Sequence, residues 1–248
     1  MPILEVKDLC KQYTKVLAAN KINFSIDAGE IFALIGPNGA GKTTTIRMIS
    51  TLIKPTSGDA VVNGYSIINE SEKVRQCITY LPDEAGAYKN MTGKSYLNFM
   101  AGMFAQSKSE IAEFTARAEK ICGLKERLDE KIGSYSRGMI RKLLLARAVM
   151  TKPKLAILDE PTSGLDVINA LDIRKTIKEM AKSEGTAFLL SSHNMLEIEY
   201  VSDRVGIIAG GRLLEIGKID DLKQKYNAEN LEEVFEMVVK NNEVSKSA

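Results

Sequence analysis

The sequence predicts an α/β fold in which a mostly parallel sheet with flanking helices carries two additions. One is a small antiparallel β lobe at the N-terminus, and the other is an α-helical lobe inserted in the middle. Short β-like runs come first in the chain, and helical spacing of apolar residues replaces them from about Gly93 to Met150. Strand and helix patterns then alternate again, which is typical of a core built from parallel βαβ units.

The runs that we expect to form strands are short, apolar and bounded by polar or turn-forming residues. In chain order they are Ile3–Val6, Ile22–Ile26, Ile31–Ile35, Ala60–Val62, Ile78–Leu81, Leu155–Leu158, Phe188–Ser191 and Val205–Ala209.

The chain of 248 residues is expected to be one domain. We predict that residues 1–30 and 58–80 form the β lobe, that residues 85–150 form the helical insertion, and that the remainder forms the core. A further helix is expected over residues 229–240. Its apolar residues lie on one stripe, which suits docking on the body of the protein or on a partner. They are Leu231, Val234, Phe235, Val238 and Val239.

Composition and charge exclude several classes of protein. Hydrophobic residues make up 44% of the chain, which is enough for a sizeable core, and the net charge of +2 predicts no bulk attraction to nucleic acid. No apolar run approaches the roughly 18 residues of a membrane helix, and the N-terminus has no signal-peptide layout. Cys10, Cys77 and Cys122 are odd in number and far apart, which favours reduced thiols.

A phosphate-binding loop is the first motif that carries chemistry. Residues Gly36–Thr43 read GPNGAGKT, which matches G-x-x-x-x-G-K-[ST], and they directly follow the predicted strand Ile31–Ile35. Lys42 is expected to reach the β- and γ-phosphates, and the Thr43 hydroxyl to bind Mg²⁺. The predicted nucleotide-binding residues of this segment are Gly36, Pro37, Asn38, Gly39, Ala40, Gly41, Lys42, Thr43 and Thr44.

The phosphate loop should open a helix whose N-terminal dipole faces the bound anion. Ile46, Ile49, Leu52 and Ile53 have helical spacing, and the helix should end near the breakers of Lys54–Gly58. A glycine-rich turn without function is the alternative interpretation, and the strand before and helix after disfavour it.

Three carboxylates follow the buried strand Leu155–Leu158. Asp159 and Glu160 end this strand, Pro161 stops it, and a short turn leads to Asp166. Acidic groups at the end of a buried strand suit a magnesium ion and an activated water. Together with the phosphate loop, they predict a nucleoside triphosphatase.

A third motif, YSRGM at Tyr135–Met139, precedes a strongly helical segment and the acidic strand. With it, the chain resembles the nucleotide-binding subunits of ATP-binding cassette (ABC) transporters over nearly its full length. Their signature LSGGQ corresponds to YSRGM here. Ser136 and Gly138 are retained, and the resemblance implies that they contact the γ-phosphate of a nucleotide bound by another subunit. Arg137 and Met139 depart from the common pattern. Taken alone, the motif could also be a simple helix cap.

The resemblance assigns roles to five further residues. Tyr13 matches an aromatic that stacks on adenine, although it could also be a half-buried strand residue. Asp159 would hold Mg²⁺ through water, and Glu160 would polarise the attacking water as general base. Asp166 matches the turn that crosses a dimer interface. His193, the single histidine, matches the switch residue that contacts the γ-phosphate.

Asp83 occupies a position where the family usually has glutamine. The resemblance implies that this residue touches the metal and the attacking water and responds to the membrane partner. A carboxylate can bind Mg²⁺ more directly, but it cannot donate a hydrogen bond when ionised. The acidic residue, the YS-x-GM signature and the tail Asn230–Phe235 resemble bacterial export-type subunits for drug or sodium efflux.

The resemblance also implies cofactors and partners. ATP and Mg²⁺ would be bound in an ATP-sandwich dimer with a second copy or with a homologous ATPase subunit. A transmembrane permease subunit would dock between the loop Asp83–Tyr88 and the helical insertion. The protein would therefore be cytoplasmic and peripheral at the inner face of the cell membrane, with no nucleic acid partner.

Other classes of protein fit less well. A soluble ABC ATPase would use the same residues, but such proteins usually carry two cassettes or a long coiled coil. A GTPase should contain N-K-x-D, and Asn20–Asn23 fails at its last residue. A module that binds ATP without turnover is disfavoured by Glu160 and His193.

Overall fold

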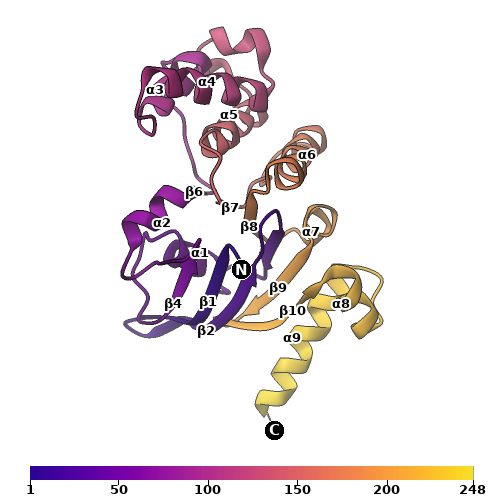
Figure 1. Cartoon of the computed structure of the whole chain (residues 1–248). Coiled ribbons are helices and arrows are strands. Elements are labelled where there is room, and N and C mark those ends of the chain that lie inside the picture. The colour runs from indigo at the N-terminus through magenta and orange to yellow at the C-terminus, as the bar shows by residue number, and fades with distance from the viewer. Residues whose placement is uncertain (248) are drawn as a thin grey trace.

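The computed structural model describes residues 1–247, and its core is a six-stranded sheet (Figure 1). Its strands are β3 (Ile31–Ile35), β6 (Ile78–Leu81), β7 (Leu155–Asp159), β8 (Ala187–Ser192), β9 (Arg204–Ala209) and β10 (Arg212–Lys218). They lie in the order β10-β9-β3-β8-β7-β6. Pairing along the sheet is parallel except between β9 and β10, which are antiparallel. The predicted mostly parallel α/β fold is confirmed.

The central strands are buried on both faces, which explains why their sequences are continuously apolar. Along β3, Ile31, Ala33 and Ile35 belong to one hydrophobic core. Phe32 and Leu34 point the other way and belong to a second core. Strand alternation therefore divides the apolar residues between two layers, one on each face of the sheet.

A four-stranded antiparallel sheet forms the β lobe. Its strands are β1 (Leu4–Tyr13), β2 (Val16–Ile26), β4 (Ser57–Val62) and β5 (Tyr65–Ser66), in the order β2-β1-β4-β5. Strands β1 and β2 extend well beyond their apolar segments because polar residues continue the pairing through irregular register shifts. Phe24 stacks on Phe32 with a ring separation of 4.9 Å, which joins the lobe to the core.

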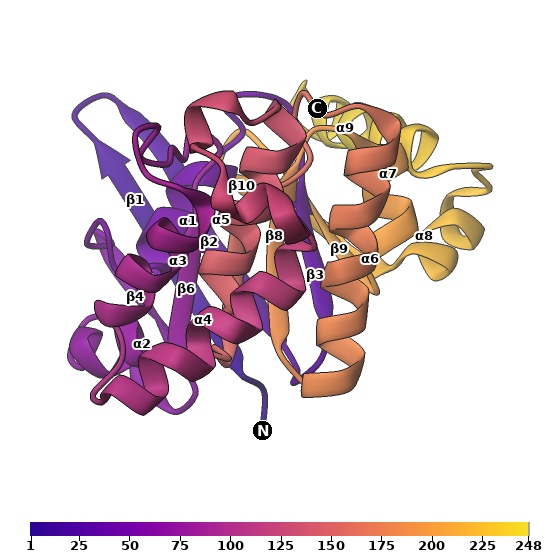
Figure 2. The same ribbon diagram turned by 90° about the horizontal axis from the view of Figure 1, so that it is seen from above.

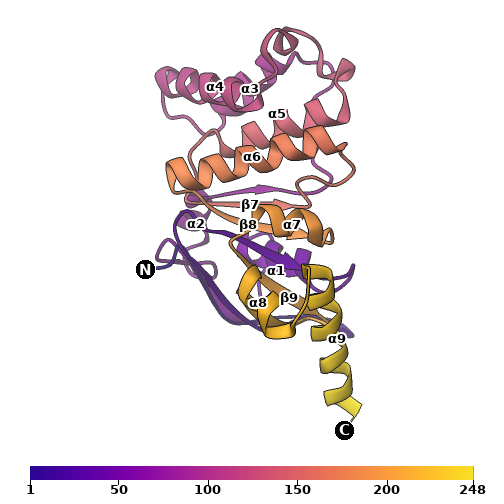
Figure 3. The same ribbon diagram turned by 90° about the vertical axis from the view of Figure 1, so that its right-hand side faces the viewer.

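Helices flank the sheet and form the inserted lobe (Figure 3). Around the sheet lie α1 (Lys42–Ile49), α2 (Ser71–Cys77), α6 (Val167–Glu184), α7 (Met195–Val201), α8 (Ile219–Tyr226) and α9 (Leu231–Ser247). The insertion contains α3 (Gly93–Gly102), α4 (Lys108–Cys122), α5 (Arg137–Val149) and two 3₁₀ helices, Lys125–Asp129 and Ile132–Ser134. No helix within residues 1–247 has the length and apolar character needed to cross a membrane.

Within residues 1–247, four short elements were not predicted from the sequence patterns, namely α2, β5, β10 and α8. The longest, α8, has eight residues, which is shorter than the window of roughly 11 residues in which helical spacing is recognised. The edge strand β10 is half-buried along most of its length and shows no alternation of buried and exposed residues. The predicted extent of α1 is also wrong. This helix ends at Ile49 because Thr51 has a left-handed φ of 60°, and Leu52 is exposed.

The apolar stripe of α9 packs against the body of the protein. Leu231, Val234 and Val238 are buried in the same hydrophobic core as Ile31, Ala33 and Ile35 of β3, and α9 contacts α7 and α8. The Leu231 N–H donates to a Glu199 carboxylate oxygen at 3.2 Å, and this carboxylate also pairs with Lys223 at 2.6 Å. Figure 2 shows α8 and α9 on the side of the molecule opposite β1 and β4. The sequence predicted that this stripe docks either on the body of the protein or on a partner, and in the structure it packs on the body.

Candidate active site

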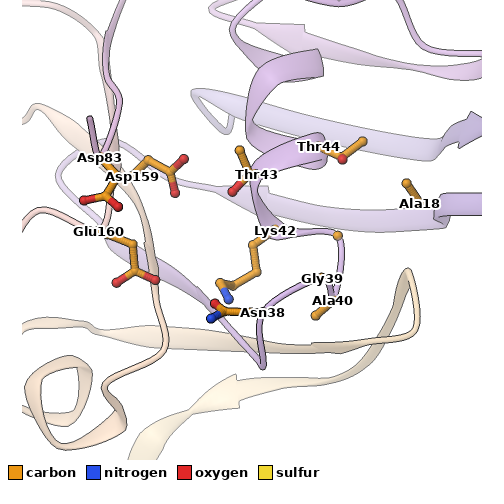
Figure 4. Close-up of a pocket in the computed structure, with 11 residues that line it drawn as sticks. Ala18, Asn38, Gly39, Ala40, Lys42, Thr43, Thr44, Asp83, Asp159 and Glu160 are labelled. Atoms are coloured by element: carbon orange, nitrogen blue, oxygen red, sulfur yellow. The ribbon is translucent and has the colours of Figure 1, made fainter. Parts of the chain in front are cut away.

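A cavity of about 240 Å³ opens where the phosphate loop faces the acidic end of β7. It is lined by Ala18, Asn38, Gly39, Ala40, Gly41, Lys42, Thr43, Thr44, Asp83, Asp159 and Glu160. Figure 4 shows the three carboxylates on one side of this cavity and the loop residues on the other. Ligands in parallel sheets bind at the carboxyl ends of strands, and β3 and β7 both end here.

The phosphate loop requires glycine at two positions because other chain segments approach its backbone closely. A Cβ added at Gly36 would lie 2.2 Å from the Ile208 carbonyl oxygen. At Gly41, φ is +108° and a Cβ would lie 2.3 Å from the Ala18 carbonyl oxygen. The loop is thus fixed between β2 and β9, and α1 begins immediately afterwards at Lys42.

The Lys42 side chain bonds back to its own loop. Its Nζ donates to the carbonyl oxygens of Gly36 at 2.6 Å and Pro37 at 3.2 Å. Burial lowers the pKa of Lys42, whereas the nearby carboxylates of Glu160 and Asp159 oppose that shift. An ammonium group paired mainly with carbonyl dipoles in a buried position can exchange them for a phosphate anion, which is a stronger acceptor.

Asp159 is positioned by two neighbours that the sequence patterns did not single out. The Ser191 hydroxyl on β8 donates to Asp159 Oδ1, and the Tyr80 hydroxyl on β6 lies 3.5 Å from Oδ2. Burial, followed by the Asp159 charge, raises the pKa of Tyr80, so its hydroxyl remains a donor. Only the alignment of β6, β7 and β8 brings these side chains to one carboxylate.

Glu160 and His193 meet although 32 residues separate them in the chain. Glu160 Oε1 lies 2.9 Å from His193 Nδ1, and the Ser192 hydroxyl lies 3.4 Å from Oε2. The Glu160 backbone has a left-handed φ of 49°, which costs of order 1–3 kcal/mol in a non-glycine residue. Such strain is typical of functional positions. His193 itself is exposed and does not line the cavity.

Tyr13 and Ala18 belong to the same β1–β2 hairpin but occupy different positions. Ala18 lines the cavity, and its carbonyl oxygen is the close neighbour of Gly41. Tyr13 lies near the tip of the hairpin, is 43% exposed, and has Lys11 Nζ at 5.4 Å from its ring centre. Its ring is therefore accessible to a base, and the adenine role remains a prediction.

The residues predicted to contact a nucleotide in trans cluster outside the cavity. Ser136 caps α5 by accepting from the Met139 N–H at 3.2 Å. Asp166 caps α6 by accepting from the Asn169 N–H at 3.0 Å, and it also accepts from the Asn169 side-chain amide at 2.6 Å. These two hydrogen bonds lower the pKa of Asp166. A Cβ at Gly138 would lie 2.4 Å from the Asn169 side chain. The two turns therefore pack together through Asn169, and their trans role remains a prediction.

Arg141 is a further residue near the site that sequence reasoning missed. It lies on α5 with 7% of its surface exposed, and its guanidinium bonds to main-chain carbonyl oxygens beside Asp83, Asp159 and Glu160. An arginine in a helix is usually exposed, so the pattern contained no signal for this burial.

With this geometry established, comparison with known proteins identifies the family. Residues 19–163 match the family model described as ABC transporter. The chain belongs to the ABC transporter family. It is 37% identical over 229 residues to the linearmycin resistance ATP-binding protein LnrL of Bacillus subtilis (strain 168), covering 92% of this chain and 73% of that protein. It is 36% identical over 223 residues to the bacitracin transport ATP-binding protein BcrA of Bacillus licheniformis, covering 90% and 72%.

Comparison with solved structures leads to the same family. A structure described as the ATP binding subunit of an ABC transporter matches with a TM-score of 0.84 at 32% identity, covering 96% of this chain and 99% of that chain. The predicted family and its ATPase activity are thus confirmed. This chain is an ATP-binding subunit of an ABC transporter, and it hydrolyses ATP.

Proposed function

We propose that this ABC ATPase powers export through a separate transmembrane permease subunit. The observation that carries the proposal is the convergence of Lys42, Thr43 and three carboxylates on one cavity, together with a separate cluster of Ser136 and Asp166 outside it. The direction is supported by relatives whose names refer to linearmycin resistance and bacitracin transport. Asp83 in place of the usual glutamine also supports it.

Each residue has a distinct task in the proposed mechanism. Lys42 exchanges its bonds to loop carbonyls for the β- and γ-phosphates of ATP, and the loop N–H groups bind the remaining oxygens. Glu160 accepts a proton from the attacking water as general base. His193 and Ser192 hold the Glu160 carboxylate, so that its lone pairs point in a fixed direction.

The residues present fit a magnesium ion. Thr43, Asp83 and Asp159 line the same cavity and carry oxygen donors, which Mg²⁺ prefers. Within residues 1–247 no three His, Cys, Asp or Glu side chains form a metal cluster. Mg²⁺ typically binds through one or two carboxylates and completes its shell with substrate phosphates and water. When bound, the ion neutralises charge on the phosphates during transfer.

The cluster of Ser136, Gly138 and Asp166 supports a site shared between two chains. These residues lie outside the cavity of their own chain, yet the Ser136 hydroxyl sits at the N-terminus of α5, where anions bind well. We propose that a second copy, or a homologous ATPase subunit, presents them to the γ-phosphate in an ATP-sandwich dimer. ATP then joins the two chains, and hydrolysis lets them separate.

The permease is proposed to dock beside the helical insertion, which would place the protein at the cytoplasmic face of the membrane. Tyr88, Phe99, Met103 and Phe104 are large apolar residues that remain exposed there, and Tyr88 meets the ring of Phe99 at 6.0 Å. A groove of about 480 Å³ runs between the insertion and α2, and it includes Met103 and Phe104. An exposed apolar set of this kind suits a protein partner.

The test is Glu160→Gln, which should lower kcat by about 10²–10⁴-fold and leave ATP binding intact. ATP should then hold two copies together as a dimer in size-exclusion chromatography. Adding Ser136→Arg should abolish that dimer, because charge and bulk enter the phosphate contact, while Ser134→Arg nearby serves as a matched control. If the Ser136→Arg double variant still dimerised with ATP, the shared site would be the wrong model.

A further inference from the structure

Arg141 makes an unusually complete set of hydrogen bonds. Its Nε donates to Pro161 O at 2.8 Å, and Nη1 donates to Pro82 O at 3.2 Å and Asp83 O at 3.1 Å. Its Nη2 donates to Asp159 O at 3.0 Å and Glu160 O at 2.8 Å. A guanidinium has five N–H donors, and five main-chain carbonyls receive them here.

The bonds join three segments that are distant in sequence. Arg141 lies on α5, which also starts with the Ser136 turn, so it belongs to the helical insertion. Pro82 and Asp83 belong to the loop after β6, and Asp159 to Pro161 form the acidic end of β7. One side chain therefore connects the insertion to both groups of acidic residues in the cavity.

Burying the charged Arg141 guanidinium costs free energy, which suggests that its hydrogen bonds have a functional role. Burial lowers the pKa of Arg141, and the charges of Asp83 and Asp159 oppose this shift. All its hydrogen-bond partners are carbonyl oxygens, so the contact controls the course of the backbone. Lysine could not replace it, because an ammonium has only three donors and lacks the planar fork.

The contact also bears on the strained backbone of Glu160. The left-handed φ of 49° must be maintained by neighbours, and the Glu160 carbonyl is held by Arg141 at 2.8 Å. On the other side, the Glu160 N–H donates to Ser191 O at 3.1 Å. These two bonds fix the carbonyl and the N–H of Glu160, and so the direction in which its carboxylate points.

We propose that Arg141 is a positioning residue that sets the distance between Asp83 and Glu160 and transmits movement of the helical insertion to both. The inference rests on the proposed role of Glu160 in water activation. Because Arg141 does not line the cavity, it acts on the catalytic step through the backbone and makes no contact of its own with ATP. A displacement of the carboxylate by about 1 Å is enough to cost on the order of 10²-fold in rate.

The test compares Arg141→Gln and Arg141→Lys with the adjacent control Lys142→Gln. Lys142 makes one ion pair, at 2.7 Å to Asp172 on α6, and touches neither loop of the site. We expect both Arg141 variants to lower kcat by about 10–100-fold, with the Kd for a fluorescent ATP analogue within about 3-fold of the parent. The control should keep its kcat within about 2-fold.

A double-mutant cycle with Glu160→Gln separates positioning from general loss of structure. If Arg141 acts through Glu160, Arg141→Gln should change the residual rate of the Glu160→Gln protein by less than about 3-fold. Multiplicative rate losses, or an unchanged kcat in Arg141→Lys, would overturn the proposal. So would a parallel loss of kcat, ATP affinity and thermal stability in both Arg141 variants. A Glu160→Gln protein that remained fully active would instead refute the role of Glu160.

Discussion

Two glycines of the phosphate loop allow backbone strain to be separated from steric contact. Gly39 has φ +79° and nothing within 4 Å of the place where a Cβ would sit. Gly41 has φ +108° and the Ala18 carbonyl oxygen 2.3 Å from that place. Alanine at either position must adopt a positive φ, but only at Gly41 must it also displace backbone.

The expected magnitudes follow from this difference. A left-handed alanine costs roughly 1–2 kcal/mol, and its less flexible unfolded state returns about 0.4–1 kcal/mol. Gly39→Ala should therefore destabilise the protein by about 1 kcal/mol. Gly41→Ala adds about 1–3 kcal/mol for the overpacked contact, giving roughly 3 kcal/mol. In a chain of this size, these values correspond to Tm decreases of about 2–4 °C and 6–12 °C.

The measurement is thermal unfolding of the nucleotide-free protein by circular dichroism, so that contacts to ATP do not contribute. ATP affinity is then measured separately, and Gly41→Ala should weaken it because Ala18 is part of the cavity wall. Equal Tm decreases for the two variants would show that the Ala18 contact is not rigid. The explanation of this glycine would then be wrong.

Three further substitutions test the site. Lys42→Ala should abolish hydrolysis and severely weaken ATP binding, because the phosphates lose their main counter-ion, and an active variant would contradict the role of the loop. Tyr13→Ala should weaken ATP and ADP equally, by about 1–3 kcal/mol, if the ring stacks on the base. Unchanged affinities would return Tyr13 to a structural role. Asp83→Gln should preserve nucleotide binding and alter the Mg²⁺ dependence of the rate, since a charged neighbour becomes neutral. An identical Mg²⁺ titration would place Asp83 outside the metal site.

The local motifs were predictable because each combines a short contiguous pattern with its own secondary structure. Residues 36–43 directly follow β3 and lead into α1, and Asp159 ends β7, as expected. Boundaries that depend on distant neighbours were predicted less well. The end of α1 depends on the conformation of Thr51, and the half-buried edge strand β10 has no clear pattern. The roles of Tyr13 and Ser136 in nucleotide contact depend on a ligand and a second chain, so they remain predictions.

The sequence by itself determined the chemistry of this protein, because a phosphate loop and an acidic strand need particular side chains at fixed spacing. Tertiary structure decided how those groups are held. Parallel pairing of β7 with β8 brings Ser191 to Asp159, and the segment after β8 brings His193 to Glu160. Arg141 is the clearest case, since its partners are main-chain carbonyls, which are present in every residue. No residue pattern can specify such partners, so only the folded chain shows which carbonyls the guanidinium meets.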